Sequence, residues 1–384
     1  MKTLFRFGLL PYVLARDMLA RGKHSPLSPY STSSDAIDAG ITWLKLAHDV
    51  TKGNGVSKGF SYLFGWSEPF PETTGYIIGT FLNYASQTGD NDAIRRAREM
   101  GDWEIEVQNQ DGGVIEGLLT KRPKPSTIFN TGMVIHGWLD LHNFSPNDRY
   151  LAAALRGGNF LVANQDADGA WRGPTEHFRI PHTYNSRVSW ALLRLARVTD
   201  ETQFEDTARR QLDWVLSMQR ANGWFDSCIF KPNGKTNTHA LAYTLRGLLE
   251  SYALVPDERY LNAVRLTSEP LINRFQIQGY LQGAFRSDWS PEVTWQCLTG
   301  IAQLGGVWLR FYELTQETRF LDAGRKAVEH AASFQETTSW PPVCGALAGS
   351  YPLYGGYAPL QYPNWATKFL VDALMLQDKL SLRQ

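Results

Sequence analysis

The sequence of 384 residues lacks several features that would assign it to a well-defined class of protein. It has three cysteines, Cys228, Cys297 and Cys344, and no CxxC pair, so neither a disulfide framework nor a cysteine-rich metal site is predicted. Its 38 lysines and arginines are balanced by 38 aspartates and glutamates, which gives no excess positive charge for a nucleic-acid partner. No apolar run approaches the roughly 18 residues that span a bilayer. We therefore expect a protein of a reducing compartment, the cytoplasm, that does not bind nucleic acid.

Motifs for nucleotides, hydrolases and metals are also missing. The sequence contains no GxGxxG, GxxxxGK or GxSxG segment. Two pairs, His136 with Asp140 and His177 with His182, have the residue types of metal ligands, but no HExxH motif or further ligand set accompanies them. The sequence therefore predicts neither a metal nor a cofactor.

Residues 1–30 are interpreted as a basic N-terminal arm that precedes a domain over residues 31–384. No small-residue cleavage site follows the short apolar run of the arm, so it is not predicted to be an export signal. Its cations alternate with Phe and Leu, a pattern that suits peripheral contact with anionic lipid; a packed or mobile arm is the alternative. The basic residues of the arm are Lys2, Arg6, Arg16, Arg21 and Lys23.

An internal repeat is the strongest signal that the sequence does contain. Five segments with helical periodicity end in a glutamine at intervals of 54 to 59 residues: Gln108, Gln165, Gln219, Gln276 and Gln335. They alternate with six more apolar segments that begin near residues 72, 129, 182, 238, 294 and 364. The first kind is charged on one side and the second is apolar nearly all round, so one must face solvent and the other must be enclosed. The predicted fold class is all-α, an (α/α)6 toroid in a single domain.

The turns after these glutamines favour the same architecture. The segments QDGG and DADGAW supply glycine where φ must be positive and an aromatic residue that can fill the space between repeats. They resemble the QW-type repeats of squalene and terpenoid cyclases and the turns of carbohydrate-active toroids. No DxDD or DDxxD segment is present, which counts against terpenoid-cyclase chemistry.

The N-termini of the inner helices are predicted to meet at one mouth of the ring, because an antiparallel outer helix separates each from the next. Free N–H groups and helix dipoles there favour an anionic ligand. Thr131, Asn237 and Asn364 are interpreted as helix N-caps. The predicted catalytic residues are Glu72, His182, Tyr184, His239, Tyr243 and Asp288. The predicted substrate-binding residues are Tyr76, Asn130, Asn185, Arg187, Arg246, Arg286, Trp289, Glu292, Trp295, Trp365 and Lys368.

Two chemistries fit these residue types. Removal of a proton beside the carboxylate of a uronate needs a base such as Tyr or His, together with cationic or amide groups that stabilise the developing charge. Hydrolysis needs two carboxyls about 5 to 9.5 Å apart, which Glu72, Asp288 and Glu292 could supply. If the substrate is acidic, one cavity should be lined by Arg187, Arg246, Arg286, Trp289 and Trp365.

Segments from nearly all six repeats resemble proteins of bacterial exopolysaccharide gene clusters, labelled polysaccharide biosynthesis protein of the VpsJ type. They include PETTGYI (71–77), HTYNSRVSWALL, NTHALAYTLRGLLE, WQCLTGIAQLGGVWLR and YPNWATKFLVDAL. The resemblance implies that the chain makes or modifies a secreted polysaccharide. Related toroids include C5-epimerases, polysaccharide lyases and glycoside hydrolases, and fold analogy does not choose among them.

The sequence therefore predicts a carbohydrate-active protein of exopolysaccharide biosynthesis. Its expected reaction is proton abstraction from an acidic poly- or oligosaccharide, leading to uronate C5-epimerisation or β-elimination. A glycoside hydrolase with paired carboxylates and a non-catalytic glycan-binding subunit are the alternatives.

Overall fold

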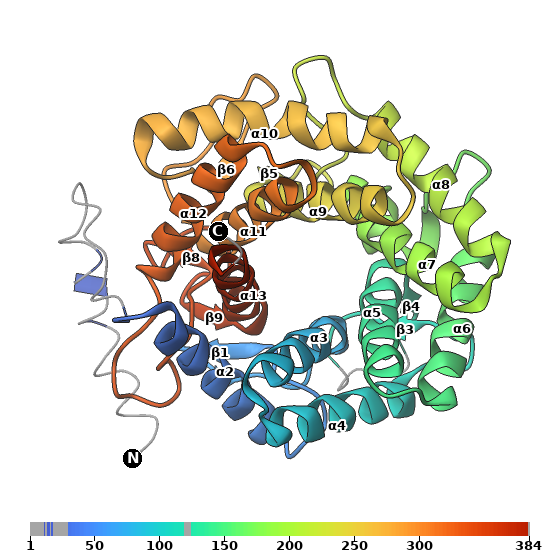
Figure 1. The fold of residues 1–384 in the computed structure, drawn as a ribbon, viewed down its shortest axis with the longest axis horizontal. Coiled ribbons are helices and arrows are strands. Elements are labelled where there is room, and N and C mark those ends of the chain that lie inside the picture. Colours follow the sequence, from blue (N-terminus) through green and yellow to red (C-terminus); the bar gives the residue numbers. More distant parts are fainter. Residues whose placement is uncertain (1–10, 12–13, 16, 18–29, 119–123, 383–384) are drawn as a thin grey trace.

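The described part of the chain forms a ring of helical hairpins (Figure 1). The computed structural model describes residues 30–118 and 124–382, together with Pro11, Leu14, Ala15 and Asp17. The outer helices are α2 (Ser33–Asp49), α4 (Asn91–Val107), α6 (Asp148–Ala163), α8 (Thr202–Ser217), α10 (Glu258–Gln278) and α12 (Thr318–Ala332). The inner helices are α3 (Pro71–Thr88), α5 (Ile128–Phe144), α7 (Ser186–Thr199), α9 (Thr238–Leu254), α11 (Leu298–Thr315) and α13 (Asn364–Ser381).

The ring is closed. Each inner helix packs against the next one along the chain, and α13 contacts both α2 and α3. The predicted single-domain (α/α)6 toroid is therefore confirmed. Two inner helices begin a few residues later than predicted, because short elements precede them: the 3-10 helix η3 (Thr183–Asn185) before α7 and strand β7 (Gln296–Cys297) before α11.

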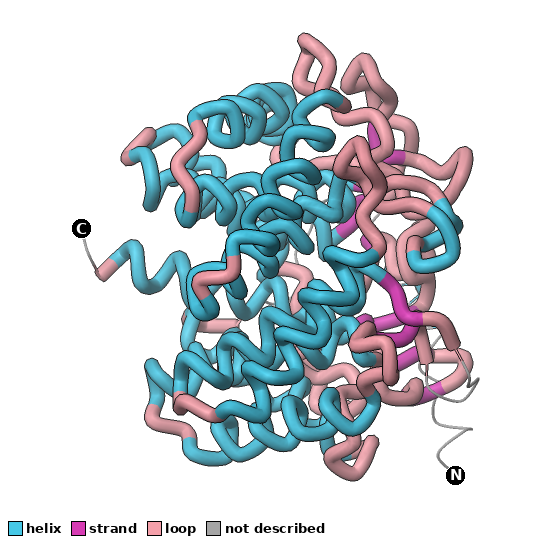
Figure 2. The backbone as a smooth tube through the Cα atoms, turned by 90° about the vertical axis from the view of Figure 1, so that its right-hand side faces the viewer, coloured by secondary structure: helices cyan, strands magenta, loops and turns pink. Residues whose placement is uncertain are grey.

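Short strands and loops gather at the end of the ring where the inner helices begin (Figure 2). Strand β1 (Gly59–Ser61) pairs with β2 (Gly65–Trp66) and with β9 (Gln361–Pro363), and Gly59 lies opposite Pro363. The other pairs are β3 (Val114–Ile115) with β4 (Ser126–Thr127), β5 (Thr236–Asn237) with β6 (Ala284–Phe285), and β7 with β8 (Ser350–Tyr351). Four of these strands lead directly into inner helices, so the N-termini of those helices meet at one end, as predicted.

The repeated glutamine joins each hairpin to the next outer helix. The Nε2 group of Gln108 donates to the carbonyls of Gly112, in its own turn (2.7 Å), and of Ala153, on α6 (3.0 Å). Bonds to the next outer helix are also made by Gln165, Gln219 and Gln335. Gln276 departs from this pattern and is exposed, because α10 continues to Gln278 and leaves Gln276 inside the helix.

Glycines let the backbones of neighbouring inner helices touch. A Cβ atom on Gly137 of α5 would lie 2.2 Å from the carbonyl oxygen of Gly75 on α3, and one on Gly75 would lie 2.6 Å from the Cα of Val134. Equivalent contacts occur between Gly247 and Ser186 and between Gly300 and Thr238. Real Cβ atoms do not approach backbone atoms so closely, so these crossings exclude any other residue without movement of a helix.

Two of the residues interpreted as N-caps have another role. The hydroxyl of Thr131 accepts from the N–H of Val114 (2.9 Å). The Nδ2 group of Asn364 donates to the Ser57 carbonyl (2.8 Å). Thr131 thus ties the start of α5 to the loop before it, and Asn364 ties the start of α13 to the segment before β1. The N-cap positions of these helices are Thr127 and Pro363, so the N-cap prediction is wrong for both residues; Asn237 occupies the N-cap position of α9 without a side-chain capping bond.

The basic residues of the N-terminal arm lie outside the described residues, so the lipid contact proposed for them stays a prediction. Asp17 is described and buried, and its carboxylate accepts from the Leu353 N–H (2.8 Å). In the part of the chain that the structure describes, no helix is both long enough and apolar enough to cross a membrane.

Candidate functional site

The inward faces of the inner helices define an axial space with two different ends. On α3 the inward residues follow helical spacing: Glu72, Tyr76, Thr80, Asn83 and Gln87. Glu72 lies in the first turn, at the end with the strands and loops, and the other four line a cavity of about 520 Å³. We call this space, which extends along the ring axis from the second turn of α3 towards its C-terminal end, the axial cavity.

Five charged or titratable residues surround the start of α3, and we call them the Glu72 cluster: Lys58, Glu72, Glu116, Glu176 and His177. Lys58 precedes β1, Glu116 follows β3, and Glu176 and His177 lie in the loop before α7. The Nδ1 atom of His177 is 3.1 Å from Glu116 Oε1, and the His177 N–H donates to Glu176 Oε1 (2.8 Å). The first contact joins two of these segments, and the charges of His177 and Lys58 both act on the Glu72 carboxyl.

The environments of Glu72 and Glu116 shift their pKa values in opposite directions. Burial raises the pKa of Glu72, although the positive charges of His177 and Lys58 oppose the rise. The Glu72 carboxyl is half-buried and, among the described residues, has no hydrogen-bond or ion-pair partner. The hydrogen bond from His177 lowers the pKa of Glu116. Two carboxyls whose pKa values are shifted in opposite directions are the arrangement used for general acid and base.

Glu176 is the buried member of the Glu72 cluster, and His182 is buried next to it. Burial raises the pKa of Glu176 to about 7, even though the Nδ2 group of Asn185 donates to its Oε2 (2.6 Å). The two ring nitrogens of His182 lie 2.7 and 3.0 Å from the carbonyls of Ile229 and His177, and burial lowers its pKa to about 4. The neutral ring of His182, a predicted catalytic residue, has one N–H and can donate to only one of these two carbonyls.

We expect Glu176→Gln to change how stability depends on pH. The native state holds this proton up to about pH 7, whereas an unfolded glutamate releases it near 4.5, so the wild type loses stability between these values as pH rises. Relative to the variant, that loss should reach roughly 3 kcal/mol at most. Urea unfolding of both proteins from pH 4.5 to 8 measures the difference, and a constant difference across this range would contradict the assignment.

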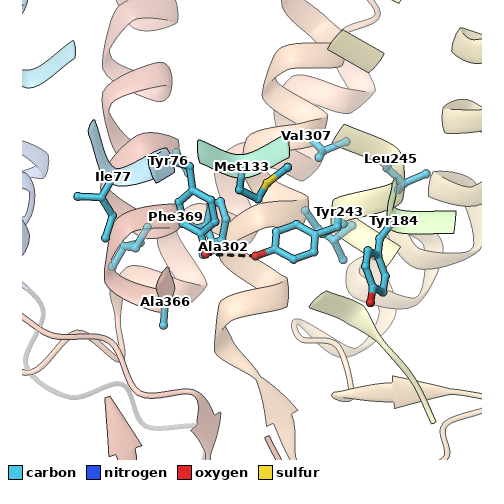
Figure 3. Close-up of a cluster of buried hydrophobic side chains, with 14 of the residues drawn as sticks. Tyr76, Ile77, Met133, Tyr184, Tyr243, Leu245, Ala302, Val307, Ala366 and Phe369 are labelled. Carbon is cyan, nitrogen blue, oxygen red and sulfur yellow. Dashed lines mark hydrogen bonds between the residues drawn. The ribbon is translucent and has the colours of Figure 1, made fainter. Parts of the chain in front are cut away.

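The other predicted catalytic rings lie together inside the toroid, tilted relative to one another. The hydroxyls of Tyr243 and Tyr76 are 3.3 Å apart (Figure 3), and the ring centroids of Tyr184 and Tyr243 are 6.4 Å apart. His239 lies 4.3 Å from the Tyr243 ring, and its Nδ1 is 2.6 Å from Gln303 Oε1. All are buried, and burial raises the pKa of both Tyr184 and Tyr243 above the ordinary tyrosine value. The structure therefore gathers these rings, but as poor bases.

Asp288 and its neighbours lie apart from these groups. The Asp288 carboxylate is exposed and accepts from the Ser290 N–H (2.8 Å) within its own turn. The turn packs on the outer ring, where the Trp289 indole donates to the Asn222 carbonyl (2.9 Å). Arg286 is exposed and donates to a backbone carbonyl of the same loop. Neither Arg286 nor Trp289 lines the axial cavity, so the expectation that they share it with Arg187 is wrong.

Four predicted substrate-binding residues do line the axial cavity: Tyr76, Arg187, Arg246 and Lys368. Tyr76, Arg187 and Lys368 come from the first two turns of α3, α7 and α13, so the cavity begins just inside the predicted mouth. Arg246 pairs with Glu250 (2.7 Å) and Lys368 with Asp372, each one helical turn away. Trp365 does not line the cavity and instead lies beside Lys58 in the Glu72 cluster.

The remaining predicted binding residues hold loops. Asn130 donates to the Ile115 carbonyl (2.8 Å), and Glu292 pairs with Lys235 (3.4 Å). The Trp295 ring lies so close to Gly283 that a Cβ atom there would approach it within 2.0 Å. The three side chains therefore stabilise loops near the starts of the inner helices.

No protein-family model matches the sequence, and no curated protein is detectably similar to it. Several solved structures have a similar fold over most of the length of both chains. A heparin-specific unsaturated glucuronyl hydrolase is 13% identical with a TM-score of 0.72, covering 91% of this chain and 98% of its own. A D-mannose isomerase is 12% identical with a TM-score of 0.72, covering 91% and 97%. The unsaturated glucuronyl hydrolase of Bacillus sp. GL1 is 15% identical with a TM-score of 0.68, covering 89% and 96%.

The chain has the fold of these carbohydrate-active toroids. At such identities the likeness establishes the fold and leaves the reaction to be argued from the site. The similarity to exopolysaccharide-cluster proteins of the VpsJ type is not confirmed by these matches.

Several residues of both regions were not singled out as site residues from the sequence. Lys58, Glu116 and Glu176 lie in loops, where no periodic pattern marks them. The charged residues of the axial cavity are recognisable in the sequence, because each interrupts an otherwise apolar helix: Asp140, Arg194, Glu250, Arg310 and Asp372. Within the described ranges, no three His, Cys, Asp or Glu side chains are grouped to hold a metal.

Proposed function

We propose that this protein is a carbohydrate-active enzyme that hydrolyses a glycosidic bond of an acidic oligosaccharide at the Glu72 cluster. The observation that carries the proposal is the Glu72 carboxyl, which is half-buried, unpartnered among the described residues and shifted towards its protonated form. Glu72 acts as general acid towards the leaving-group oxygen. Glu116, ionised beside His177, acts as the base that activates water.

The acidic character of the substrate follows from the groups around Glu72. The Lys58 ammonium lies 5.1 Å from the Phe70 centroid and 5.9 Å from the Trp365 centroid. The Trp365 indole is held by a hydrogen bond to the Tyr357 hydroxyl (2.9 Å). A cation beside fixed aromatic rings suits a sugar that carries a carboxylate, because charge pairing and ring stacking act together. Several of the similar structures are described as unsaturated glucuronyl hydrolases, which supports a uronate.

Proton abstraction by Tyr184 or Tyr243, leading to epimerisation or β-elimination, is the second candidate. One observation favours it: the Arg187 guanidinium lies 4.8 Å from the centroid of the Tyr243 ring, where it could stabilise a carboxylate. The raised pKa of both tyrosines weighs against it, because a base must first lose its proton. A role in exopolysaccharide production rests on the sequence resemblance alone.

Matched substrates and variants separate these reactions. The purified protein is incubated with saturated and unsaturated glucuronyl oligosaccharides and with neutral oligosaccharides of equal length. Hydrolysis should release reducing ends. From the unsaturated substrate it releases a sugar whose ring opens and whose enol becomes a ketone, so the ultraviolet absorbance of the double bond should be lost, whereas elimination would create that absorbance. We expect Tyr184→Phe and Tyr243→Phe to retain turnover. Loss of turnover in these two variants, with Glu72→Gln active, would establish proton abstraction, and binding without turnover in every protein would establish a glycan-binding subunit.

A further inference from the structure

The axial cavity contains a buried cation that the fold does not neutralise. Arg187 is 4% exposed, and within the described part of the chain its guanidinium has no carboxylate or hydrogen-bond partner. Its neighbours are aromatic: the guanidinium carbon lies 4.8 Å from the Tyr243 centroid and 5.7 Å from those of Tyr76 and Phe369. Cation–π contacts contribute about 0.5 to 2 kcal/mol, whereas removing such an ion from water costs several kcal/mol. The rings therefore leave much of the cost of burying Arg187 uncompensated.

The other charges of the cavity do not supply the missing counter-ion. The lining contains six basic and four acidic side chains, an excess of two positive charges when His136 is neutral. Each of the four acids already pairs with a cation other than Arg187: Asp140 with Arg194, Glu250 with Arg246 and Arg310, Glu313 with Arg310 and Lys379, and Asp372 with Lys368. Burial and the charge of Arg187 both lower the pKa of Lys368, which accords with a positive potential in this space.

The cavity has the size and walls of a site for a small hydroxylated molecule. Its volume of about 520 Å³ falls within the range of small-ligand pockets. Its walls carry hydrogen-bonding side chains suited to hydroxyl groups, namely Thr80, Asn83, Gln87 and Gln303, and Trp190 offers an aromatic face. The Tyr76, Tyr243 and Phe369 rings pack against one another (Figure 3). Tyr76 and Phe369 line this space, whereas Glu72 does not.

We propose that the axial cavity is a second binding site, separate from the Glu72 cluster, for a small hydroxylated organic anion whose carboxylate or phosphate group binds Arg187 and Lys368. A planar guanidinium binds either group through two parallel hydrogen bonds. The ligand is a sugar acid or a sugar phosphate, both of which share this chemistry. The site does not depend on hydrolysis at Glu72.

Calorimetric titration with glucuronate, glucose 6-phosphate and glucose tests this site. We expect one or both anions to bind the wild type and neutral glucose not to bind; which anion binds identifies the acidic group. Arg187→Gln should weaken anion binding by at least about tenfold, the effect of losing a charged hydrogen bond worth roughly 1.5 kcal/mol or more. Lys368→Met should weaken it in the same direction and serves if the first variant does not fold.

Control variants separate this proposal from the Glu72 mechanism. Arg286→Gln, which removes an exposed arginine outside the cavity, should leave anion binding unchanged. Lys58→Met should remove any glucuronate that binds at the Glu72 cluster but leave the anion site that depends on Arg187 and Lys368. Absence of anion binding to the wild type would overturn the site. So would binding that is lost in Lys58→Met and kept in Arg187→Gln, because it would place the anion at the Glu72 cluster.

Discussion

Glu72→Gln is expected to lower kcat by at least about 100-fold on an acidic oligosaccharide, with little change in substrate binding. The amide keeps the shape of the side chain but cannot deliver a proton to the leaving oxygen. Because no described residue bonds to the Glu72 carboxyl, the substitution breaks no contact within the fold, and the melting temperature should stay close to that of the wild type. Steady-state kinetics and thermal unfolding measure the two quantities.

Asp288→Asn is the matched control for this experiment. It also exchanges a carboxylate for an amide near the inner-helix starts, but Asp288 is exposed in a turn on the outer ring. Its kcat should stay within about threefold of the wild type, as for surface substitutions worth less than about 0.5 kcal/mol. If Asp288→Asn is inactive and Glu72→Gln is active, the assignment of the general acid is wrong.

Gly137→Ala is expected to destabilise the protein by about 1 to 3 kcal/mol or more. The new methyl group would lie 2.2 Å from the Gly75 carbonyl oxygen, and a backbone atom cannot rotate away as a side chain can. The helices α3 and α5 must therefore separate. The free energy of unfolding in urea, followed by tryptophan fluorescence, measures the effect.

Gly306→Ala, on the inner helix α11, is expected to stabilise the protein instead. A Cβ atom there would meet Ala373 Cβ at 3.6 Å, an ordinary van der Waals contact. Replacing a helical glycine without a clash stabilises by about 0.4 to 1 kcal/mol, because the unfolded chain loses freedom. Equal destabilisation by the two alanines would show that the close crossing at Gly137 is not the cause.

The architecture could be predicted because it depends on periodicity. The spacing of Gln108, Gln165 and Gln219 reflects a bond that each makes to the next outer helix, so one physical contact is repeated along the chain. Gln276 has the same spacing but makes no such bond, because α10 continues past it. The spacing alone does not reveal where a helix ends.

The site was predictable in part, for a different reason. Glu72 and Trp365 follow from their positions at helix starts, and both lie at the predicted end of the ring. Glu116 and Glu176 come from loops that fold over this end, and their approach depends on tertiary contacts such as the bond from Asn185 to Glu176. Arg187 was assigned to the mouth although its side chain lines the axial cavity, because helix position alone does not give the direction of a long side chain.

The glycine crossings of the inner ring restrict how this protein can diversify. Where Gly137 meets the Gly75 carbonyl, the distance between α3 and α5 is set by main-chain atoms, which all sequences share. The inner diameter of the toroid should therefore vary little among related sequences. Ligand preference can change mainly through the side chains that project into the ring and through the loops over its mouth. Relatives that keep these glycines should accept ligands of similar girth while differing in the charge and hydroxyl pattern that they recognise.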